Sequence, residues 1–430
     1  MKVNETIRMI EEGRMDSLLI QLYGEEKLTD SRERCRMVLD GYGKTFGTEE
    51  DVLLFSSPGR TEISGNHTDH NHGKVLAGSI NLDCLGVAAK NASCQVRIVS
   101  ETYGQDFTID LNHLEPSAKK AGTADLVKGI LKGFEESGCS VGGFNAYVTS
   151  NVISAAGVSS SASFEMLLCS MLNVFFNEGR MDTVAYAHIG KYAENHYWDK
   201  ASGLLDQMAC AVGGLITIDF CEPAVPVVEK IDFDFASQGH SLIIVQTGKG
   251  HADLSADYSA VPEEMKRVAA FFGKEVLAQI SEEDVIAHLP EIRKAAGDRS
   301  VLRALHFFEE NKRVEAEVQA LKDGRFQDFL ANITASGNSS WKWLQNCFTN
   351  SNYQEQGITV ALAQTEPFIA EKQKGACRVH GGGFAGVIMA MLPNEIVDEY
   401  IAYIEKAMGE GSAYRMSIRP YGAICMNDFA

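Results

Sequence analysis

A run of small residues leads directly into an apolar stretch in the first half of the chain. Residues 154–163 read SAAGVSSSAS, and residues 164–176 continue as FEMLLCSMLNVFF. The apolar stretch predicts a buried helix, because Glu165 and Asn173 interrupt it and it is shorter than the roughly 20 residues of a membrane span. Small residues before a helix leave its first N–H groups and its positive dipole end open to an anion. The stretch therefore predicts either a phosphate-binding turn or a serine-capped helix that packs closely in a core.

The length of the chain predicts two domains. Its 430 residues exceed the roughly 250–300 at which a single core stops growing, and a cleft between domains is a common ligand site. Mixed strand and helix patterns run through both halves, and two prolines mark a change near residues 221–240. We expect an α+β protein with an N-terminal helical extension at 1–48, a first domain at 49–230 and a second at 231–430. Residues 4–45 predict two helices, with Asp30 or Ser31 as the cap between them.

Charge and cysteine usage restrict the partners and the compartment. With 39 Lys and Arg against 58 Asp and Glu, the formal net charge is −19, which excludes nucleic acid and an anionic membrane as expected partners. A nucleotide is still compatible, because residues 147–164 carry no charge at all. The ten cysteines form no Cys-x-x-Cys pair and the chain begins with a helical pattern instead of a signal peptide, so we expect a cytoplasmic protein.

Residues 56–75 concentrate polar side chains after a short apolar run. The segment reads SSPGRTEISGNHTDHNHGKV, and its hydrogen-bonding groups suit a polyhydroxylated ligand such as a sugar. A polar surface turn is the plain alternative. A metal site is another, although the spacing is not that of a helical His-x-x-x-His face and no cysteine lies nearby. The candidate residues are Arg60, Asn66, His67, Asp69, His70 and His72.

Residues 375–392 place three consecutive glycines between two strand-like segments. The segment reads GACRVHGGGFAGVIMAML. Glycines permit backbone conformations that other residues resist, and they let a phosphate or another backbone approach closely. The pattern predicts a tight hairpin or a ligand contact.

Taken together and in this order, the three stretches resemble the motifs of the GHMP small-molecule kinases and, within them, of the galactokinases. Residues 58–73, PGRTEISGNHTDHNHG, are similar to Pro-Gly-Arg-Val-Asn-Leu-Ile-Gly-Glu-His-Thr-Asp-Tyr-Asn-x-Gly. Residues 155–165 are similar to Gly-Ala-Gly-Leu-Ser-Ser-Ser-Ala-Ser-Leu-Glu, and residues 375–386 to Gly-x-Arg-Met-Thr-Gly-Gly-Gly-Phe-Gly-Gly. The resemblance covers roughly residues 50–430. It implies a two-domain GHMP kinase fold with the active site in the cleft between the domains.

The resemblance also implies a role for individual residues. Asp206 would act as general base with Arg60 beside it, where the guanidinium keeps the aspartate ionised and shares charge on the attacking oxygen. Ser161 and Glu194 would hold Mg²⁺. The sugar would be contacted by Asn66, His67, Asp69, Gly203, Asp206 and Tyr258, and the phosphates of ATP by Ala155, Ala156, Gly157, Val158, Ser159, Ser160 and Ser161.

Several positions depart from the family pattern. Asn66 stands where galactokinases have a Glu that accepts a hydrogen bond from the sugar, and Glu62 stands where they have an Asn. An amide still accepts a hydrogen bond, but without charge. Thr123 stands where the family commonly has a Trp near the nucleotide base, and Val379 and His380 replace Met and Thr. The departures leave the preferred sugar and nucleotide open.

The expected activity is ATP-dependent phosphorylation of the anomeric hydroxyl of galactose, which yields galactose 1-phosphate. One alternative is a kinase of the same family for another monosaccharide, such as an amino sugar, a pentose or a uronic acid. A second is a sugar sensor that kept the fold and lost the chemistry. We expect a monomer in each case.

Overall fold

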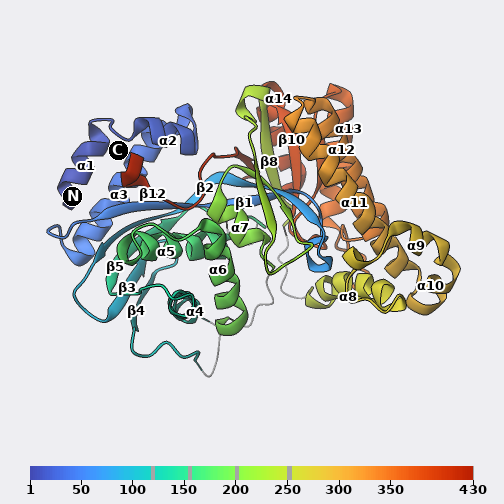
Figure 1. Cartoon of the computed structure of the whole chain (residues 1–430). Coiled ribbons are helices and arrows are strands. Elements are labelled where there is room, and N and C mark those ends of the chain that lie inside the picture. Colours follow the sequence, from blue (N-terminus) through green and yellow to red (C-terminus); the bar gives the residue numbers. More distant parts are fainter. Residues whose placement is uncertain (118–121, 154–156, 199–202, 249–253, 430) are drawn as a thin grey trace.

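Two β-sheets and the helices around them form the protein. The computed structural model describes residues 1–117, 122–153, 157–198, 203–248 and 254–429. Ala155 and Ala156, two of the predicted phosphate-binding residues, lie outside this part. In Figure 1 the larger sheet has α1 to α3 above it and α4 to α6 below it, and the smaller sheet stands beside it. The predicted α+β class is confirmed.

The larger sheet has the strand order β12-β1-β2-β5-β3-β4, and β6 and β7 extend from β2. β1 and β2 pair antiparallel from Leu53 opposite Ala88 to Ser64 opposite Leu76, with irregularities between Pro58 and Arg60 and after Glu62. Such irregularities re-aim side chains, and here they fall in the predicted sugar motif. The strands are β1 (Leu53–Ser64), β2 (Lys74–Lys90), β3 (Gln95–Ser100), β4 (Gln105–Asp110), β5 (Phe144–Ser150), β6 (Leu215–Asp219), β7 (Val227–Ile231) and β12 (Ile424–Cys425).

One face of this sheet is covered by helices from the first half of the chain. α5 packs with both β1 and β2, and its buried side chains include Met166, Leu167 and Phe175, as the apolar stretch predicts. The predicted buried helix is confirmed. These helices are α4 (Thr123–Glu136), α5 (Ser160–Phe176), α6 (Thr183–Tyr197) and α7 (Leu205–Val212).

The N-terminal residues form three helices on the opposite face, where the sequence predicted two. They are α1 (Val3–Glu11), α2 (Asp16–Tyr23) and α3 (Leu28–Phe46). The chain turns at Gly24, whose φ of 93° is costly for other residues. Because α3 begins soon after this turn, at Leu28, Asp30 and Ser31 lie inside its first turns and cap no helix. Leu85 and Val87 of β2 pack against these helices, while Cys84 and Ala88 face the other side, as strand alternation requires.

A buried aspartate fastens this extension to the rest of the molecule. Asp83 of β2 is fully buried and pairs with Arg34 of α3 and with Arg419 near the C-terminus. The hydroxyl of Tyr23 donates to its Oδ2 at 2.6 Å. Burial alone would raise the pKa of Asp83, but the two guanidinium groups hold it below its usual range. The N-terminal helices are therefore anchored to the larger sheet by buried polar contacts.

The smaller sheet has the order β11-β8-β10-β9. α13 and α14 cover one face, while Phe329 of α12 and Met389 of β10 share a core with Ile63 and Leu76 of the larger sheet. The strands are β8 (His240–Gln246), β9 (Ala376–His380), β10 (Val387–Pro393) and β11 (Ala413–Met416). The helices are α8 (Ser255–Phe271), α9 (Glu282–Ala287), α10 (Leu289–Ala296), α11 (Asp298–Lys322), α12 (Phe326–Ser339), α13 (Gly357–Lys372) and α14 (Asn394–Met408).

The chain passes from the larger sheet to the smaller one between β7 and β8. β7 ends at Ile231 and β8 begins at His240. The last strand is an exception to a simple division, because β12 returns to the larger sheet and pairs Cys425 with Phe55 of β1.

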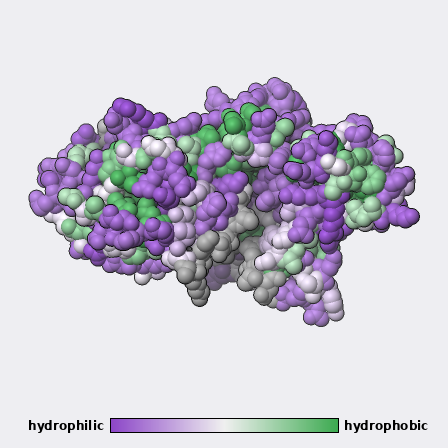
Figure 2. Space-filling model, turned by 60° about the horizontal axis from the view of Figure 1, so that its bottom comes forward, coloured by the Kyte–Doolittle hydropathy of each residue, from purple (hydrophilic) through white to green (hydrophobic). Residues whose placement is uncertain are grey.

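Polar side chains cover most of the face drawn in Figure 2, and apolar groups form small separate areas on it. None of the described helices is long and apolar enough to cross a membrane.

Candidate active site

A cavity of about 240 Å³ opens where β1, the loop after it, α7 and the glycines after β9 meet. Arg60 and every residue predicted to contact the sugar line it, although they come from distant parts of the sequence. His72 is not in the wall. The lining residues are Arg60, Glu62, Asn66, His67, Asp69, His70, Glu194, Gly203, Leu205, Asp206, Gln207, Tyr258, Gly381 and Gly382.

Arg60 and Asp206 form an ion pair in the wall of this cavity. The Nε of Arg60 donates to Oδ1 of Asp206 at 2.8 Å, and Nη2 lies 2.7 Å from the same oxygen. Asp206 occupies the first turn of α7, where the helix dipole favours a negative charge. Arg60 is 8% exposed, so the pair is held in place while the carboxylate, 30% exposed, still reaches the cavity.

The predicted phosphate turn is tied to the same aspartate. Ser159 donates its hydroxyl to Oδ2 of Asp206 at 2.5 Å, and Nη1 of Arg60 donates to the carbonyl of Gly157. Ser159 stands just before α5 in a left-handed conformation, with φ 60° and ψ 58°, which is rare for a residue with a side chain, and its hydroxyl makes no capping hydrogen bond to the helix. The N-terminus of α5 and the carboxylate of Asp206 therefore border one space.

Ser161 and Glu194, the two residues predicted to hold Mg²⁺, are in contact. The hydroxyl of Ser161 in the first turn of α5 donates to Oε1 of Glu194 at 3.1 Å. Gln207 donates to Oε2 of Glu194 at 3.0 Å and to Oε2 of Glu165 at 3.1 Å. Two oxygen donors beside a phosphate site fit Mg²⁺, which takes its other ligands from phosphate and water. Among the described residues no three His, Cys, Asp or Glu side chains form a metal cluster, so the histidines of the first motif are not assembled into one.

The loop that contains the glycines of the third motif contacts the sugar motif. β9 and β10 do form a hairpin, and the loop between them also enters the cavity wall. Nε2 of His67 lies 2.7 Å from the carbonyl of Gly382, which can only accept, so Nε2 carries the proton. Burial lowers the pKa of His67 to about 4, and the ring is neutral. The hydroxyl of Tyr258 donates to the carbonyl of Gly383 at 2.7 Å.

Close packing explains two glycines near the cavity. A Cβ at Gly203 would lie 2.8 Å from Oδ2 of Asp69. A Cβ at Gly382 would lie 2.3 Å from the ring of Tyr258. Any larger residue would displace a side chain that lines the cavity.

Comparison with known proteins matches these two regions of the chain. Residues 40–90 match the galactokinase galactose-binding signature, and residues 125–214 match the N-terminal domain of GHMP kinases. The galactokinase of Lactococcus lactis subsp. lactis is 28% identical over 385 residues, which cover 86% of this chain and 89% of the relative.

The chain is a GHMP kinase of the galactokinase type.

Other relatives and solved structures agree with this assignment. The galactokinase of Lacticaseibacillus casei is 27% identical, covering 88% of the kinase and 94% of the relative. The crystal structure of the Lactococcus lactis galactokinase complexed with galactose superposes with a TM-score of 0.74 at 25% identity, covering 90% of this chain and 98% of that one. A mevalonate kinase structure shares the fold alone, with a TM-score of 0.60 at 15% identity over 86% and 99% of the two chains. The predicted GHMP kinase fold is confirmed.

A second cavity of about 240 Å³ lies on the other side of the phosphate turn in this kinase. Ser160, Ser161 and Thr123 belong to its wall. Its apolar lining includes Phe107, Phe164 and Trp198. Sequence reasoning missed Trp198, because an isolated aromatic residue at a helix end belongs to no recognisable pattern.

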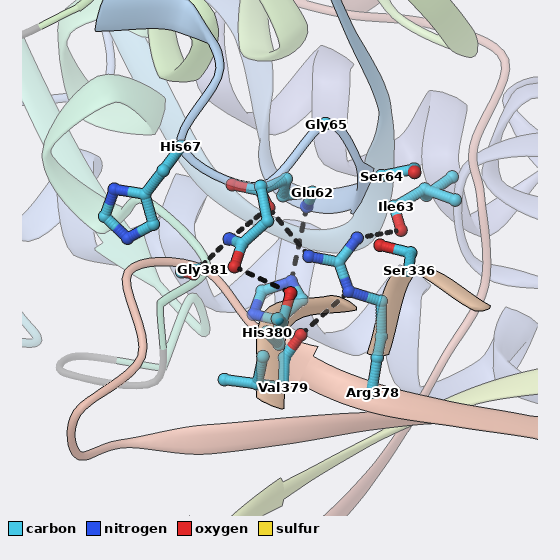
Figure 3. A network of polar contacts seen from close by, with 12 residues as sticks. Glu62, Ile63, Ser64, Gly65, His67, Ser336, Arg378, Val379, His380 and Gly381 are labelled. Atoms are coloured by element: carbon cyan, nitrogen blue, oxygen red, sulfur yellow. Dashed lines mark hydrogen bonds and ion pairs between the residues drawn. The ribbon is translucent and has the colours of Figure 1, made fainter. Parts of the chain in front are cut away.

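A buried polar network lies beneath the sugar motif of the kinase (Figure 3). Nη2 of Arg378 lies 3.2 Å from Oε1 of Glu62, and Nη1 donates to the carbonyl of Ile63 at 2.7 Å. The backbone N–H of Glu62 donates to Nε2 of His380 at 3.2 Å, so the proton of this histidine sits on Nδ1. Burial, Arg60 and Arg378 lower the pKa of His380 well below its usual range. Sequence reasoning noted Glu62 and His380 only as departures from the family pattern.

Proposed function

We propose that this kinase transfers the γ-phosphate of ATP to the anomeric hydroxyl of galactose, giving galactose 1-phosphate and ADP. The observation that carries the proposal is the position of Asp206. Its two carboxylate oxygens are held by Arg60 and by Ser159 of the phosphate turn, and it lines the cavity that carries the sugar motif. A hydroxyl beside Asp206 would stand next to the N-terminus of α5, where phosphate is favoured.

The proposed reaction is a single displacement. Asp206 accepts the proton of the anomeric hydroxyl, the sugar oxygen forms a bond to the γ-phosphorus, and the bond from that phosphorus to the bridging oxygen of ADP breaks. Arg60 keeps Asp206 ionised and stabilises charge on the attacking oxygen. Bound Mg²⁺, held by Ser161 and Glu194, would neutralise charge on the phosphates.

The two halves of the chain would divide the work. Residues 49–230 supply Arg60, Asp206 and the phosphate turn, and residues 231–430 supply Tyr258 and the glycines of the third motif. The second cavity, lined by Thr123 and Trp198, would take the base of ATP. His67, Asp69, Gly203 and Tyr258 would surround the sugar, with Asn66 in the wall behind them. Residues 155–161 would hold the phosphates.

The charge of the sugar cavity narrows the choice among sugars. The carboxylates of Glu62, Asp69, Glu194 and Asp206 face it together with one guanidinium, that of Arg60, among the lining residues that the structure describes. An anionic sugar such as a uronic acid would meet like charges at short range, which is unfavourable. An amino sugar is the second candidate, because its ammonium group would find carboxylates.

The remaining features of the proposal are a monomer and a cytoplasmic location. All ten cysteines are free, which suits a reducing compartment.

A coupled assay of ADP release over a sugar panel tests the proposal. The panel contains galactose, galactosamine, arabinose and galacturonic acid, and phosphorus NMR identifies the product. We expect the highest kcat/KM with galactose and a loss of about 10²- to 10⁴-fold in kcat for Asp206→Asn. A higher kcat/KM with another sugar would reject galactose, and full activity of the variant would reject Asp206 as the base.

A further inference from the structure

Glu62 and Asn66 are in contact and occupy the sugar motif in an order opposite to the family pattern. Nδ2 of Asn66 donates to Oε1 of Glu62 at 2.8 Å. The family pattern has the amide at position 62 and the carboxylate at position 66, whereas this chain has the carboxylate on β1 and the amide in the loop. Both residues line the sugar cavity.

The amide of Asn66 has no capacity left for a ligand. Nδ2 also donates to the carbonyl of Gly381 at 2.7 Å, which fixes the orientation of the amide because a carbonyl only accepts. Oδ1 accepts from Nδ2 of Asn346 at 2.8 Å and from the hydroxyl of Ser340 at 3.3 Å. Both amide hydrogens and both lone-pair directions are thus used, and the side chain is fully buried. Asn66 supports the wall and offers the sugar nothing.

The carboxylate of Glu62 is anchored on one oxygen only. Oε1 accepts from Asn66 at 2.8 Å and from Nη2 of Arg378 at 3.2 Å. Oε2 accepts no hydrogen bond from the residues that the structure describes, and Glu62 faces the cavity with 6% of its surface exposed. Arg378 is itself immobilised, because Nε and Nη1 donate to the carbonyls of Val379 and Ile63. Figure 3 shows Glu62 between this guanidinium and Gly381. One oxygen is held rigidly, and the other remains available.

We propose that Glu62 is the specificity-determining carboxylate of the sugar site. Its Oε2 accepts a hydrogen bond from a sugar hydroxyl other than the anomeric one, which belongs to Asp206. This inference rests on the proposed sugar kinase activity and adds a contact that Asn66 cannot make. The site then selects a sugar that presents a donor at this point. It disfavours one that lacks the donor or carries a carboxylate there, by about 10- to 100-fold in kcat/KM.

The variant Glu62→Gln separates this role from a purely structural one. The Gln carbonyl still accepts from Asn66 and Arg378, while its NH₂ group replaces the acceptor that faces the cavity. We expect the KM for galactose to rise about tenfold or more, with little change in kcat or in the KM for ATP, while Tm falls because the buried Arg378 loses a charged partner. Discrimination against galacturonic acid should fall. If Glu62 only neutralises Arg378, Tm falls and neither the KM nor the sugar preference moves, which would overturn the inference.

A matched control is Glu264→Gln. Glu264 is also buried and also paired with arginines, Arg299 and Arg303, but it lies outside the cavity wall. Its variant should change Tm without changing the KM for galactose.

Exchanging the two residues gives a second test. Glu62→Asn removes the carboxylate, and Asn66→Glu places two carboxylates side by side, so each single variant should lose tenfold or more in kcat/KM. The double variant Glu62→Asn with Asn66→Glu restores one amide and one carboxylate in the family order, and it should exceed the poorer single variant by at least tenfold. A double variant no better than that single variant would overturn the inference.

The outcomes distinguish this inference from the proposed function. If the wild-type kinase phosphorylates no sugar of the panel, the proposed function fails. If it phosphorylates one while Glu62→Gln leaves the KM for that sugar and the sugar preference unchanged, only the role of Glu62 fails.

Discussion

At the scale of residues, the ion pair of Arg60 and Asp206 lies at the centre of the proposed chemistry. The family pattern placed Arg60, Asp206, Ser161 and Glu194, because each occupies a fixed place in a motif, and the structure brings them together. It could not reveal that Ser159 bonds Asp206. That contact joins residues far apart in sequence, and only the folded chain creates it.

The fork of Arg60 should be essential to the rate. Arg60→Lys keeps the charge but loses the geometry in which Nε and Nη2 reach Asp206 while Nη1 reaches Gly157. We expect kcat to fall about 10- to 100-fold in the ADP-release assay, with a small change in Tm. The control is Arg97→Lys, since Arg97 makes a similar double contact with Asp106 on the exposed surface. If both variants keep full kcat, the fork has no role.

We expect the buried carboxyl group of Glu317 to lower the free energy of unfolding. Both carboxylate oxygens are buried, and Ser64 nearby favours the charged form only in part, so burial together with the neighbouring Glu310 raises the pKa of Glu317 well above its usual range. The folded state therefore binds a proton that the unfolded chain releases above pH 4.5, so its destabilising effect grows with pH.

Glu317→Gln removes this effect. We expect the free energy of unfolding at pH 8 to rise by about 1 kcal/mol or more, with a smaller gain at pH 5, in urea titrations. Glu315→Gln, at an exposed site on the same helix, is the control. A gain that does not depend on pH would contradict the explanation.

At the scale of elements, the strands and the apolar helix could be predicted from the sequence, whereas the turns between helices and the exact ends of the elements could not. The apolar residues 164–176 predicted α5 because almost all of its faces are buried. The sequence predicted two N-terminal helices with one break near Asp30 or Ser31, whereas the chain turns at Gly13 between α1 and α2 and at Gly24 before α3. Trp198, at the C-terminal end of α6, enters the second cavity only because the sheet and α5 approach it. Periodicity finds elements, whereas long-range packing decides their ends.

The junction before α7 offers a test at this scale. Gly203→Ala would place a Cβ 2.8 Å from Oδ2 of Asp69 and push that carboxylate aside. We expect the KM for galactose to rise about tenfold while the KM for ATP is unchanged. Gly43→Ala in α3 is the control, because only the methyl group of Thr48, at 3.2 Å, has to yield and no cavity residue is near. An unchanged KM for galactose would show that Asp69 does not contribute to binding the sugar.

At the scale of the molecule, the interface of the two sheets is rich in neutral histidines. His306 of α11 lies 2.9 Å from the carbonyl of Asn66 and 2.8 Å from the hydroxyl of Ser339, and burial lowers its pKa to about 4. Between pH 6.5 and about 4, His306 therefore stays neutral in the folded state but is protonated in the unfolded chain. This contribution to stability is complete above pH 6.5 and is lost as the pH falls toward 4.

His306→Gln should make folding less sensitive to acid. Its amide can donate to the carbonyl of Asn66 without taking up a proton. We expect a lower free energy of unfolding at pH 7 but a smaller loss between pH 7 and 5 than in the wild type, by up to about 1.4 kcal/mol per pH unit. Urea unfolding at both values measures it, with the exposed His113→Gln as control. Parallel pH profiles would refute the role of His306.

The last strand places a condition on how the larger sheet is completed. β1 carries Arg60 and Glu62, and in the part of the chain that the structure describes one of its edges pairs with β12, where Phe55 lies opposite Cys425, far away in the sequence. Contacts of such separation form late, because a long loop must close first. Until β12 has been synthesised and has paired, this edge of the strand that carries Arg60 stays open, and it can pair wrongly with other segments.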